Sequence, residues 1–508
     1  MSFSRLFDFY HRLEQHPVAV SILSLFLGAS LSCAFSPLEW FWLTPLLLAL
    51  QFRFLTRAKN GLHAAWLFWM FGLGLFLAGV SWVYISIHVF GGVSMPMAAI
   101  PTLLLCMLLS CAHPLVGAAF RIHLPSSPRK QAILFATFIA LLDLGRGWFF
   151  TGFPWLALGY SQTPPSPLAG YAPLFGVYGM SFAIALIAAL LAIGSRAKPG
   201  PWLVALLILG CGALLRFVPW THPVGEPIRV ALIQSNFSQD QKWRPENFPI
   251  TLKLFHKLVV ENPAQLVVLP ETAMPFFLDT IPQSYIAELK TLAKRQNGDL
   301  LIGVPTRAGE RYWNSAVSFG TSPSQRYSKS HLVPFGEYVP PGFRWFMVLV
   351  NIPMVGFTGG PDNQPPLEIA GQRVAVNICY EDLFGQELLH ALPRATLMVN
   401  MSNTAWFGRS LAQAQHLQIA RLRALETGRP MLRATNTGMT AIIQPDGSVL
   451  AVLPPFESGA LTETVQGYQG ITPYILFGDI PIAFLILGVM IWFHKTEWRK
   501  RSPALKQF

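Results

Sequence analysis

Eight long apolar stretches limit how this chain can fold more than any other feature of its sequence. Each has about 18 residues or more with few charges, the length that an α-helix needs to cross a bilayer. They lie at residues 17–35, 38–55, 64–87, 94–118, 131–150, 171–194, 201–218 and 474–493. The mean hydropathy of the 508-residue chain, +0.42, is too high for an ordinary soluble protein. The sequence therefore predicts an α-helical membrane domain with eight transmembrane helices.

Residues 219–473 interrupt this pattern between the seventh and eighth stretches. Their apolar runs are short and are separated by charged, Gly-rich and Pro-rich segments. We therefore expect seven transmembrane helices in 1–218, a water-soluble domain in 219–473, and the eighth helix with a basic tail in 474–508. Residues 17–35 resemble a signal peptide in length, but seven more apolar stretches follow, so we interpret them as a retained helix.

The net charge of +12 lies almost entirely outside the predicted soluble domain. That domain holds 20 Lys and Arg against 19 Asp and Glu, so nucleic acid is disfavoured as a partner. Apart from Arg146 and Arg216, which lie in apolar stretches, the other basic residues gather in the termini and in alternate loops of an eight-helix chain, namely Arg5, Arg12, Arg53, Arg57, Lys59, Arg121, Arg129, Lys130, Arg196, Lys198, Lys495, Arg499, Lys500, Arg501 and Lys506. By the positive-inside rule, both termini are cytoplasmic and the soluble domain lies across the membrane from them.

Two charged residues lie inside the fifth apolar stretch. Asp143 and Arg146 are spaced i,i+3, so a helix brings them to one face. Because an isolated charge inside a membrane is costly, we expect these two side chains to pair.

Within the soluble domain, Val-rich and Ile-rich runs alternate with helical patterns. The strand-like runs lie at 228–237, 264–273, 299–307, 311–320, 373–382, 395–403, 429–438 and 440–450, the last with the turn QPDGSV. The helical patterns lie at 245–261, 283–297, 383–392 and 410–427. This alternation predicts a layered α/β domain with polar chemistry at strand ends. The motifs GxGxxG, GxxxxGK[ST], HExxH and CxxC are absent from the sequence, so we expect no nucleotide cofactor and no metal.

Three polar residues next to apolar runs are candidates for chemistry. Glu271 ends a strand-like run, where burial would raise its pKa and suit a general base, although a helix cap or surface acid would look the same. Lys329 lies in the loop RYSKSHLVPFGEYVP and could stabilise an oxyanion, although loop lysines are usually solvated. Cys379 precedes a predicted helix whose dipole would favour a thiolate, although such a cysteine is often inert core.

Cys379 is the one cysteine of the predicted soluble domain. The other four lie in apolar stretches, at Cys33, Cys106, Cys111 and Cys211. A disulfide within the soluble domain is therefore excluded.

The order Glu271, Lys329, Cys379, with a strand before each, resembles the Glu-Lys-Cys triad of the nitrilase superfamily. Together with the apolar stretches, the blocks TGFPWLALGY, PLFGVYGMSF, VPFGEYVP, CYED and AWFG resemble the apolipoprotein N-acyltransferase family, which completes lipoprotein maturation in the bacterial inner membrane. The resemblance covers essentially the whole chain and implies an αββα sandwich for the soluble domain, on the periplasmic side. One departure is Thr404, in SNTAWFG, where the family pattern has an acid.

The resemblance implies a role for individual residues. Glu271 would be the general base, Lys329 the transition-state stabiliser and Cys379 the nucleophile. The implied supporting residues are Glu337, Tyr380 and Glu381, and the positions that match the family's pocket are Trp243, Asn314, Ser402, Asn403 and Trp406. Residues 341–360 are apolar but too short and Pro-interrupted to span a bilayer. We expect them to form an interfacial lid or, alternatively, a loop packed on the membrane domain, with lipid contacts from Phe343, Trp345, Phe346 and Phe357.

The implied reaction is an acyl transfer in two steps. Cys379 takes the sn-1 acyl chain of a phospholipid, which the family suggests is phosphatidylethanolamine, as a thioester. The α-amino group of a diacylglyceryl-cysteine, the first residue of an apolipoprotein, then attacks the thioester. A membrane-tethered amidase that hydrolyses C–N bonds is the alternative, and a sensor or transporter with a degenerate domain is a third possibility.

Overall fold

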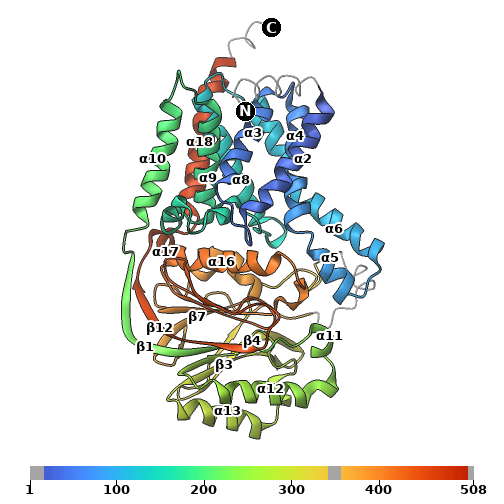
Figure 1. The fold of residues 1–508 in the computed structure, drawn as a ribbon, viewed down its shortest axis with the longest axis vertical. Coiled ribbons are helices and arrows are strands. Elements are labelled where there is room, and N and C mark those ends of the chain that lie inside the picture. The colour runs from blue at the N-terminus through green and yellow to red at the C-terminus, as the bar shows by residue number, and fades with distance from the viewer. Residues whose placement is uncertain (1–15, 341, 343–355, 502–508) are drawn as a thin grey trace. The chain divides into compact units, whose positions relative to one another are not determined.

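The computed structural model describes residues 16–340, 342 and 356–501 (Figure 1). The chain divides into two units. Unit 1 holds the described residues of 1–81, 99–217 and 479–508, and unit 2 holds those of 82–98 and 218–478. Unit 1 is helical, whereas unit 2 contains all the named strands of the described chain.

Unit 1 is built from long apolar helices. They are α2 (Pro17–Leu31), α3 (Leu43–Arg57), α4 (Gly61–Gly79), most of α6 (Met95–Ser110), α7 (Ala112–Ile122), α8 (Pro128–Arg146), α9 (Ala172–Ile193), α10 (Gly200–Leu215) and α18 (Ile480–Arg501). Within the described residues, four helical segments are long and apolar enough to cross a membrane, at Pro17–Ala34, Gly61–Gly79, Met95–Ile122 and Pro167–Ile193. The full count of eight transmembrane helices stays a prediction.

The expected pairing inside α8 is present. Arg146 Nη2 lies 2.6 Å from Asp143 Oδ1, and both side chains are buried. The other oxygen of Asp143 accepts hydrogen bonds from the Leu158 N–H and the Ser181 hydroxyl, at 2.8 and 2.7 Å. Arg146 Nη1 donates to the Trp155 carbonyl at 2.9 Å. This ion pair therefore ties α8 to α9 and to the irregular segment before it.

Unit 2 contains two six-stranded sheets. The first has the order β12-β1-β2-β3-β4-β5 and the second the order β11-β10-β9-β8-β7-β6. Parallel pairing joins β1 to β2 and β2 to β3 in the first sheet, and β7 to β8 and β8 to β9 in the second. The strand bounds are β1 Thr221–Gln234, β2 Leu266–Val268, β3 Asp299–Ala308, β4 Arg311–Gly320, β5 Arg326–Ser328, β6 Leu367–Ile369, β7 Gln372–Ile378, β8 Leu397–Ser402, β9 Met431–Thr435, β10 Ala441–Ile443, β11 Val449–Val452 and β12 Gly459–Gly470.

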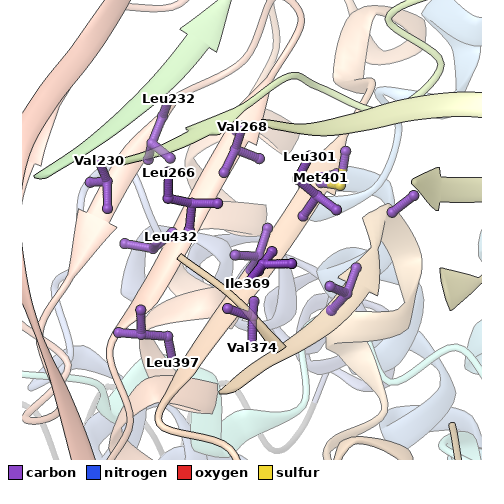
Figure 2. Packing of buried hydrophobic residues seen from close by; sticks show 14 of the residues in the cluster. Val230, Leu232, Leu266, Val268, Leu301, Ile369, Val374, Leu397, Met401 and Leu432 are labelled. Atoms are coloured by element: carbon purple, nitrogen blue, oxygen red, sulfur yellow. The ribbon is translucent and has the colours of Figure 1, made fainter. Parts of the chain in front are cut away.

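The two sheets pack face to face through a shared apolar core (Figure 2). Successive residues of a strand point to opposite faces, so Val230 and Leu232 of β1 enter this core, while Ala231 between them joins the helix-covered side. In the second sheet, Leu397 of β8 enters the shared core and Met398 the opposite one. Because both faces of these strands are buried, their sequences are almost continuously apolar.

Helices cover the outer face of each sheet. α12 (Phe248–Glu261) and α13 (Gln283–Arg295) pack on the first sheet, through residues such as Phe255 and Leu289. α16 (Ala412–Thr427) and α17 (Pro473–Phe477) pack on the second, through Leu417 and Tyr474. The resulting order of layers, helix, sheet, sheet, helix, agrees with the αββα sandwich that the resemblance implied.

Some sequence-based elements differ from the structure. The predicted helix over 383–392 is wrong, because only α15 (Gly385–Leu388), a single turn, forms there. Phe384 just before it has φ −104° and ψ 77°, which is not helical. Three strands were not expected: β5, β6 and β12. The first two have three residues each, and β12 is a Gly-rich edge strand that shows little apolar alternation.

Replacement of Leu397 by alanine tests the shared core between the sheets. Leu397 is fully buried there, so Leu397→Ala should lower the free energy of unfolding of unit 2 by about 3 kcal/mol. For a unit of this size, that is a fall in melting temperature of roughly 6–12 °C, measurable by intrinsic fluorescence in detergent. Leu450→Ala on β11, at a side chain that is 47% exposed, is the matched control and should change little. Equal shifts in the two variants would contradict the packing described here.

Candidate active site

Segments that follow three different strands bring the predicted triad together. Glu271 lies after β2 and Lys329 directly after β5, both in the first sheet, whereas Cys379 directly follows β7 of the second sheet. Lys329 Nζ lies 3.4 Å from Glu271 Oε1, and the charges of both groups act on the Cys379 thiol. The three residues, far apart in sequence, thus meet where strand ends of the two sheets come together.

Lys329 is buried between two carboxylates. Its Nζ lies 2.9 Å from Glu337 Oε2 in addition to the contact with Glu271, and the residue is 1% exposed. Asn314 Nδ2 on β4 bridges the same two acids, at 2.8 Å from Glu271 and 2.9 Å from Glu337. Burial alone would lower the pKa of Lys329, but the charges of Glu337 and Glu271 outweigh burial and raise it. The lysine is therefore a permanent cation, and the solvated-loop alternative is wrong for it.

Glu271 is held as a carboxylate. Burial acts to raise its pKa, but the Lys329 charge and the hydrogen bonds from Asn314 and from the Asn403 backbone N–H together lower it below the ordinary value. The Asn403 N–H donates to Glu271 Oε2 at 2.7 Å. The expectation that burial would raise this pKa is therefore wrong, because it left out these partners. A surface role is also excluded, since the residue is only 7% exposed.

The backbone around Glu271 is unusually close to the neighbouring strand. A Cβ atom at Gly303 of β3 would overlap the backbone of residues 270–272, so glycine is required there. Thr272 has φ +44°, a left-handed conformation that is unfavourable for a β-branched residue. The turn that presents Glu271 thus depends on support from its surroundings.

Cys379 is a buried, neutral thiol in the resting site. Burial raises its pKa well above the ordinary value, the Glu271 charge raises it further, and Lys329 only partly opposes them. The expected thiolate-stabilising helix is absent, because α15 has four residues. Cys379 has φ +55°, and Asn400 Nδ2 donates to its carbonyl at 3.1 Å. A strained backbone therefore presents the sulfur, and a base must deprotonate it before it can attack.

Glu381 joins the Lys329 loop to the Cys379 turn. Its Oε1 accepts hydrogen bonds from the Ser330 and His331 backbone N–H groups, at 2.7 and 3.2 Å. Its Oε2 accepts from the Ile378 N–H at 2.6 Å, and the Tyr327 hydroxyl lies 2.9 Å from both oxygens. Glu381 is 2% exposed, so these bonds are shielded from water. Glu381 therefore links the loop that carries Lys329 to the turn that carries Cys379.

The remaining candidates take different places. Asn314 and Asn403 bind Glu271 directly, as described above. Ser402, at the end of β8, donates through Oγ to Asn400 Oδ1 at 2.6 Å and thus supports the Cys379 turn through Asn400. Trp406 contacts the ring of Phe90 at a centroid distance of 5.9 Å.

Aromatic side chains surround the loops of the site. The ring of Tyr380 lies 5.2 Å from that of Phe384. Phe357 packs edge-on against Tyr312 at 5.0 Å, and its N–H donates to the Glu337 carbonyl at 3.0 Å. Trp243 directly follows the short helix α11 (Gln239–Lys242). The other proposed lid residues lie outside the described part of the chain, namely Phe343, Trp345 and Phe346.

A buried charge cluster behind Cys379 was missed by the sequence analysis. Asp382 accepts from His416 Nε2 at 2.7 Å and from Arg433 Nη1 at 3.1 Å. Arg433 Nη1 also donates to Asn400 Oδ1 at 2.8 Å, and Asn400 holds the Cys379 carbonyl. The only signal in the sequence was an arginine inside an apolar strand, in PMLRAT.

Lys242 was missed as well, and Thr404 stays without a role. Lys242 is 3% exposed and lies against the backbone of Glu271. Thr404 is fully buried, and within the described residues its Oγ1 has no hydrogen-bond partner. Nothing in the structure explains why a threonine stands there.

The αββα layers agree with a nitrilase-like domain, and the Carbon-nitrogen hydrolase family model matches residues 229–472, which include Glu271, Lys329 and Cys379. The model for the Apolipoprotein N-acyltransferase N-terminal domain matches residues 27–190. Apolipoprotein N-acyltransferase of Nitrosomonas europaea is 45% identical over 478 residues, which are 92% of this chain and 96% of the relative. That of Chromobacterium violaceum is 43% identical over 96% of this chain and 97% of the relative. The chain belongs to the apolipoprotein N-acyltransferase family.

Among solved structures, the chain is similar to an amidase from Nesterenkonia sp.. The sequence identity is 18% and the TM-score 0.36, and the match covers 52% of this chain and 97% of the amidase.

The charge balance around Cys379 predicts an unusual response to substitution. Because the Glu271 charge raises the pKa of Cys379, Glu271→Gln should lower that pKa and speed alkylation of the Cys379 peptide by iodoacetamide at pH 8. The same change should reduce acyl transfer by about 100-fold or more, since the base is lost. Mass spectrometry of the labelled peptide gives the alkylation rate.

Lys329→Met is the opposing control, because Lys329 lowers the pKa of the thiol. It should slow alkylation relative to the unchanged protein. If both substitutions changed the alkylation rate in the same direction, the electrostatic account of the thiol would be wrong.

Proposed function

We propose that this chain transfers an acyl chain from a phospholipid to the N-terminal amine of diacylated apolipoproteins. The relatives that support this activity match more than 90% of the chain. The observation that carries the chemistry is a buried neutral thiol next to a carboxylate and a fixed ammonium. A thiol, a base and a cation arranged in this way can carry out acyl transfer through a thioester.

In the first step, the Glu271 carboxylate takes the proton of Cys379, and the sulfur attacks the sn-1 ester carbonyl of the phospholipid. Lys329 and the Tyr380 backbone N–H stabilise the oxyanion. When the C–O bond breaks, Glu271 returns the proton to the departing alkoxide, and lysophospholipid leaves. The acyl chain stays on Cys379 as a thioester.

In the second step, the α-amino group of the diacylglyceryl-cysteine attacks the thioester carbonyl. Glu271 takes a proton from this nitrogen, the C–S bond breaks, and Glu271 passes the proton to the departing thiolate of Cys379. A thioester suits this step because it reacts with amines more readily than an oxygen ester does. The acceptor amine, rather than water, distinguishes the reaction from amide hydrolysis.

The supporting residues follow from the contacts of the site. Glu337 and Asn314 fix Lys329, and Glu381 fixes the two loops that carry Lys329 and Cys379. The proposed pocket residues are Trp243, Asn314, Ser402, Asn403 and Trp406, and Phe357 is proposed to contact the acyl chains. Phosphatidylethanolamine is the proposed donor.

The proposed setting is the bacterial inner membrane, with eight transmembrane helices and both termini in the cytoplasm. Seven of these helices lie in 1–218 and the eighth in 474–508, so the catalytic domain of 219–473 is periplasmic. The positive charge of alternate loops supports this topology, as does the apolar character of the helices of unit 1.

Incubation with phosphatidylethanolamine alone tests the thioester. Mass spectrometry of the intact protein should find one acyl chain added, located on Cys379 and removable by hydroxylamine. A diacylated lipopeptide should then remove the chain and become N-acylated. Cys379→Ala should form no adduct and have no activity. Release of free fatty acid in place of acylated lipopeptide would identify a hydrolase.

Fusions to alkaline phosphatase test the topology, because this enzyme is active only in the periplasm. A fusion after Gly92 should be active and a fusion after Ser126, in the basic fourth loop, inactive. Immunoblots show whether both fusions are made in equal amounts. The opposite pattern of activity would place the catalytic domain in the cytoplasm and overturn the proposed topology.

A further inference from the structure

Lys242 is a buried ammonium close to the general base, yet it does not touch a carboxylate. It is the last residue of α11 (Gln239–Lys242) and is 3% exposed. Its Nζ lies 3.3 Å from the Glu271 carbonyl oxygen and 3.3 Å from Thr272 Oγ1. Within the part of the chain that the structure describes, these neutral oxygens are its hydrogen-bond partners. Burial of an ammonium is costly, so the position of Lys242 calls for an explanation in its contacts.

The two residues that Lys242 contacts form the strained turn of the catalytic base. Thr272 has φ +44°, and a strained residue keeps its conformation only when its surroundings fix it. Lys242 binds both the backbone carbonyl of Glu271 and the side chain of Thr272. It therefore holds both residues of the turn.

The first residue of the same helical turn supports the carboxylate itself. Gln239 Oε1 accepts a hydrogen bond from Asn403 Nδ2 at 2.8 Å, and the Asn403 N–H donates to Glu271 Oε2 at 2.7 Å. Asn403 is further held by Asn436 Nδ2, at 3.0 Å from its Oδ1. α11 thus supports Glu271 in two ways. Lys242 binds the Glu271 carbonyl, and Gln239 binds Asn403, whose N–H binds the Glu271 carboxylate.

We propose that Lys242 is a positioning residue for the general base: its ammonium fixes the Glu271–Thr272 turn, and its charge helps to keep Glu271 ionised. The inference rests on the proposed function, because Glu271 is the base of the first acyl-transfer step. Lys242 itself touches no reacting atom.

The charges around Lys242 define its effect on pH dependence. Burial lowers the pKa of Lys242 to about 7, and the Glu271 charge opposes that shift. The partners of Lys242 and Gln239 on neighbouring elements, Thr272 and Asn403, are neutral, so Glu271 is the ionised group that faces Lys242. Lys242 is therefore charged below about pH 7. Its charge lowers the pKa of Glu271, so the effect is present throughout the acid range in which Glu271 titrates.

The test is the pH profile of thioester formation, measured with the full-length protein in detergent and phosphatidylethanolamine as the only substrate. Lys242→Met removes the charge but keeps the length of the side chain. It should lower the plateau rate by about tenfold or more, because the base is less well placed. It should also move the acid limb of the profile to higher pH, because Glu271 becomes easier to protonate.

Two further variants separate positioning from general stability. Lys242→Arg restores the charge, so its acid limb should return to the original position even if the plateau stays low. Lys253→Met, at an exposed lysine of α12, should change neither. The melting temperature of Lys242→Met should fall little, since an apolar side chain of similar volume often replaces a buried charge without loss of stability.

The outcomes are distinct. An unchanged acid limb in Lys242→Met would overturn the inference, whether the plateau rate were also unchanged or fell in proportion to the folded fraction. An acid limb that Lys242→Arg fails to restore would overturn the role of the charge. Absence of any thioester in the unchanged protein would instead refute the proposed reaction, and the melting temperatures would show that the protein was folded.

Discussion

The site depends on the burial of one cation between two acids. Lys329 lies within 3.4 Å of Glu271 and 2.9 Å of Glu337, and Asn314 binds both acids. Removal of either acid would leave a buried charge poorly compensated, which costs several kcal/mol. The cluster can form only when the ends of β2, β4 and β5 are in register and the following loop is closed. The charges of Lys329, Glu271 and Glu337 therefore constrain how the segments after β2 and β5 lie against β4.

The same cluster sets the state of the nucleophile. Glu271 is ionised because Lys329, Asn314 and the Asn403 N–H stabilise its charge. Burial raises the pKa of the Cys379 thiol, and the charge of Glu271 raises it further, so the thiol stays protonated. A protonated thiol in a buried site is protected from oxidation and alkylation, which proceed through the thiolate. The sulfur of the resting site thus keeps its proton.

Local patterns in the sequence were sufficient for the central strands, whereas the triad was proposed from a resemblance to a known family. Val230 and Leu232 alternate with Ala231 on two buried faces, and such a run can hardly be anything but a buried strand. Glu271, Lys329 and Cys379 stood out because each follows a strand, and their order matched a known family. The edge strand β12 was missed, because an exposed edge leaves little apolar alternation to detect.

Local patterns could not predict contacts between residues that are far apart in the sequence. Residues 383–392 look helical, but helix propensity is a weak prior. There, the chain is held by the buried carboxylates of Glu381 and Asp382, which bind Ser330 and Arg433 respectively. The charged state of Glu271 likewise depends on Asn403, 132 residues away in the sequence. The sign of its pKa shift was therefore predicted wrongly from burial alone.

The buried ion pairs of the described chain have two kinds of origin in the sequence. Asp143 and Arg146 lie one turn apart on a single helix, so α8 brings them together by itself. Lys329 and Glu271 are 58 residues apart in the sequence, so they come into contact only when the sheet has formed. A local pair stabilises its helix at little entropic cost, whereas a distant pair is expensive to assemble. Both distant pairs, Lys329–Glu271 and Arg433–Asp382, act through their charges on the Cys379 thiol, so the buried charge that only the complete domain can assemble is gathered around this residue.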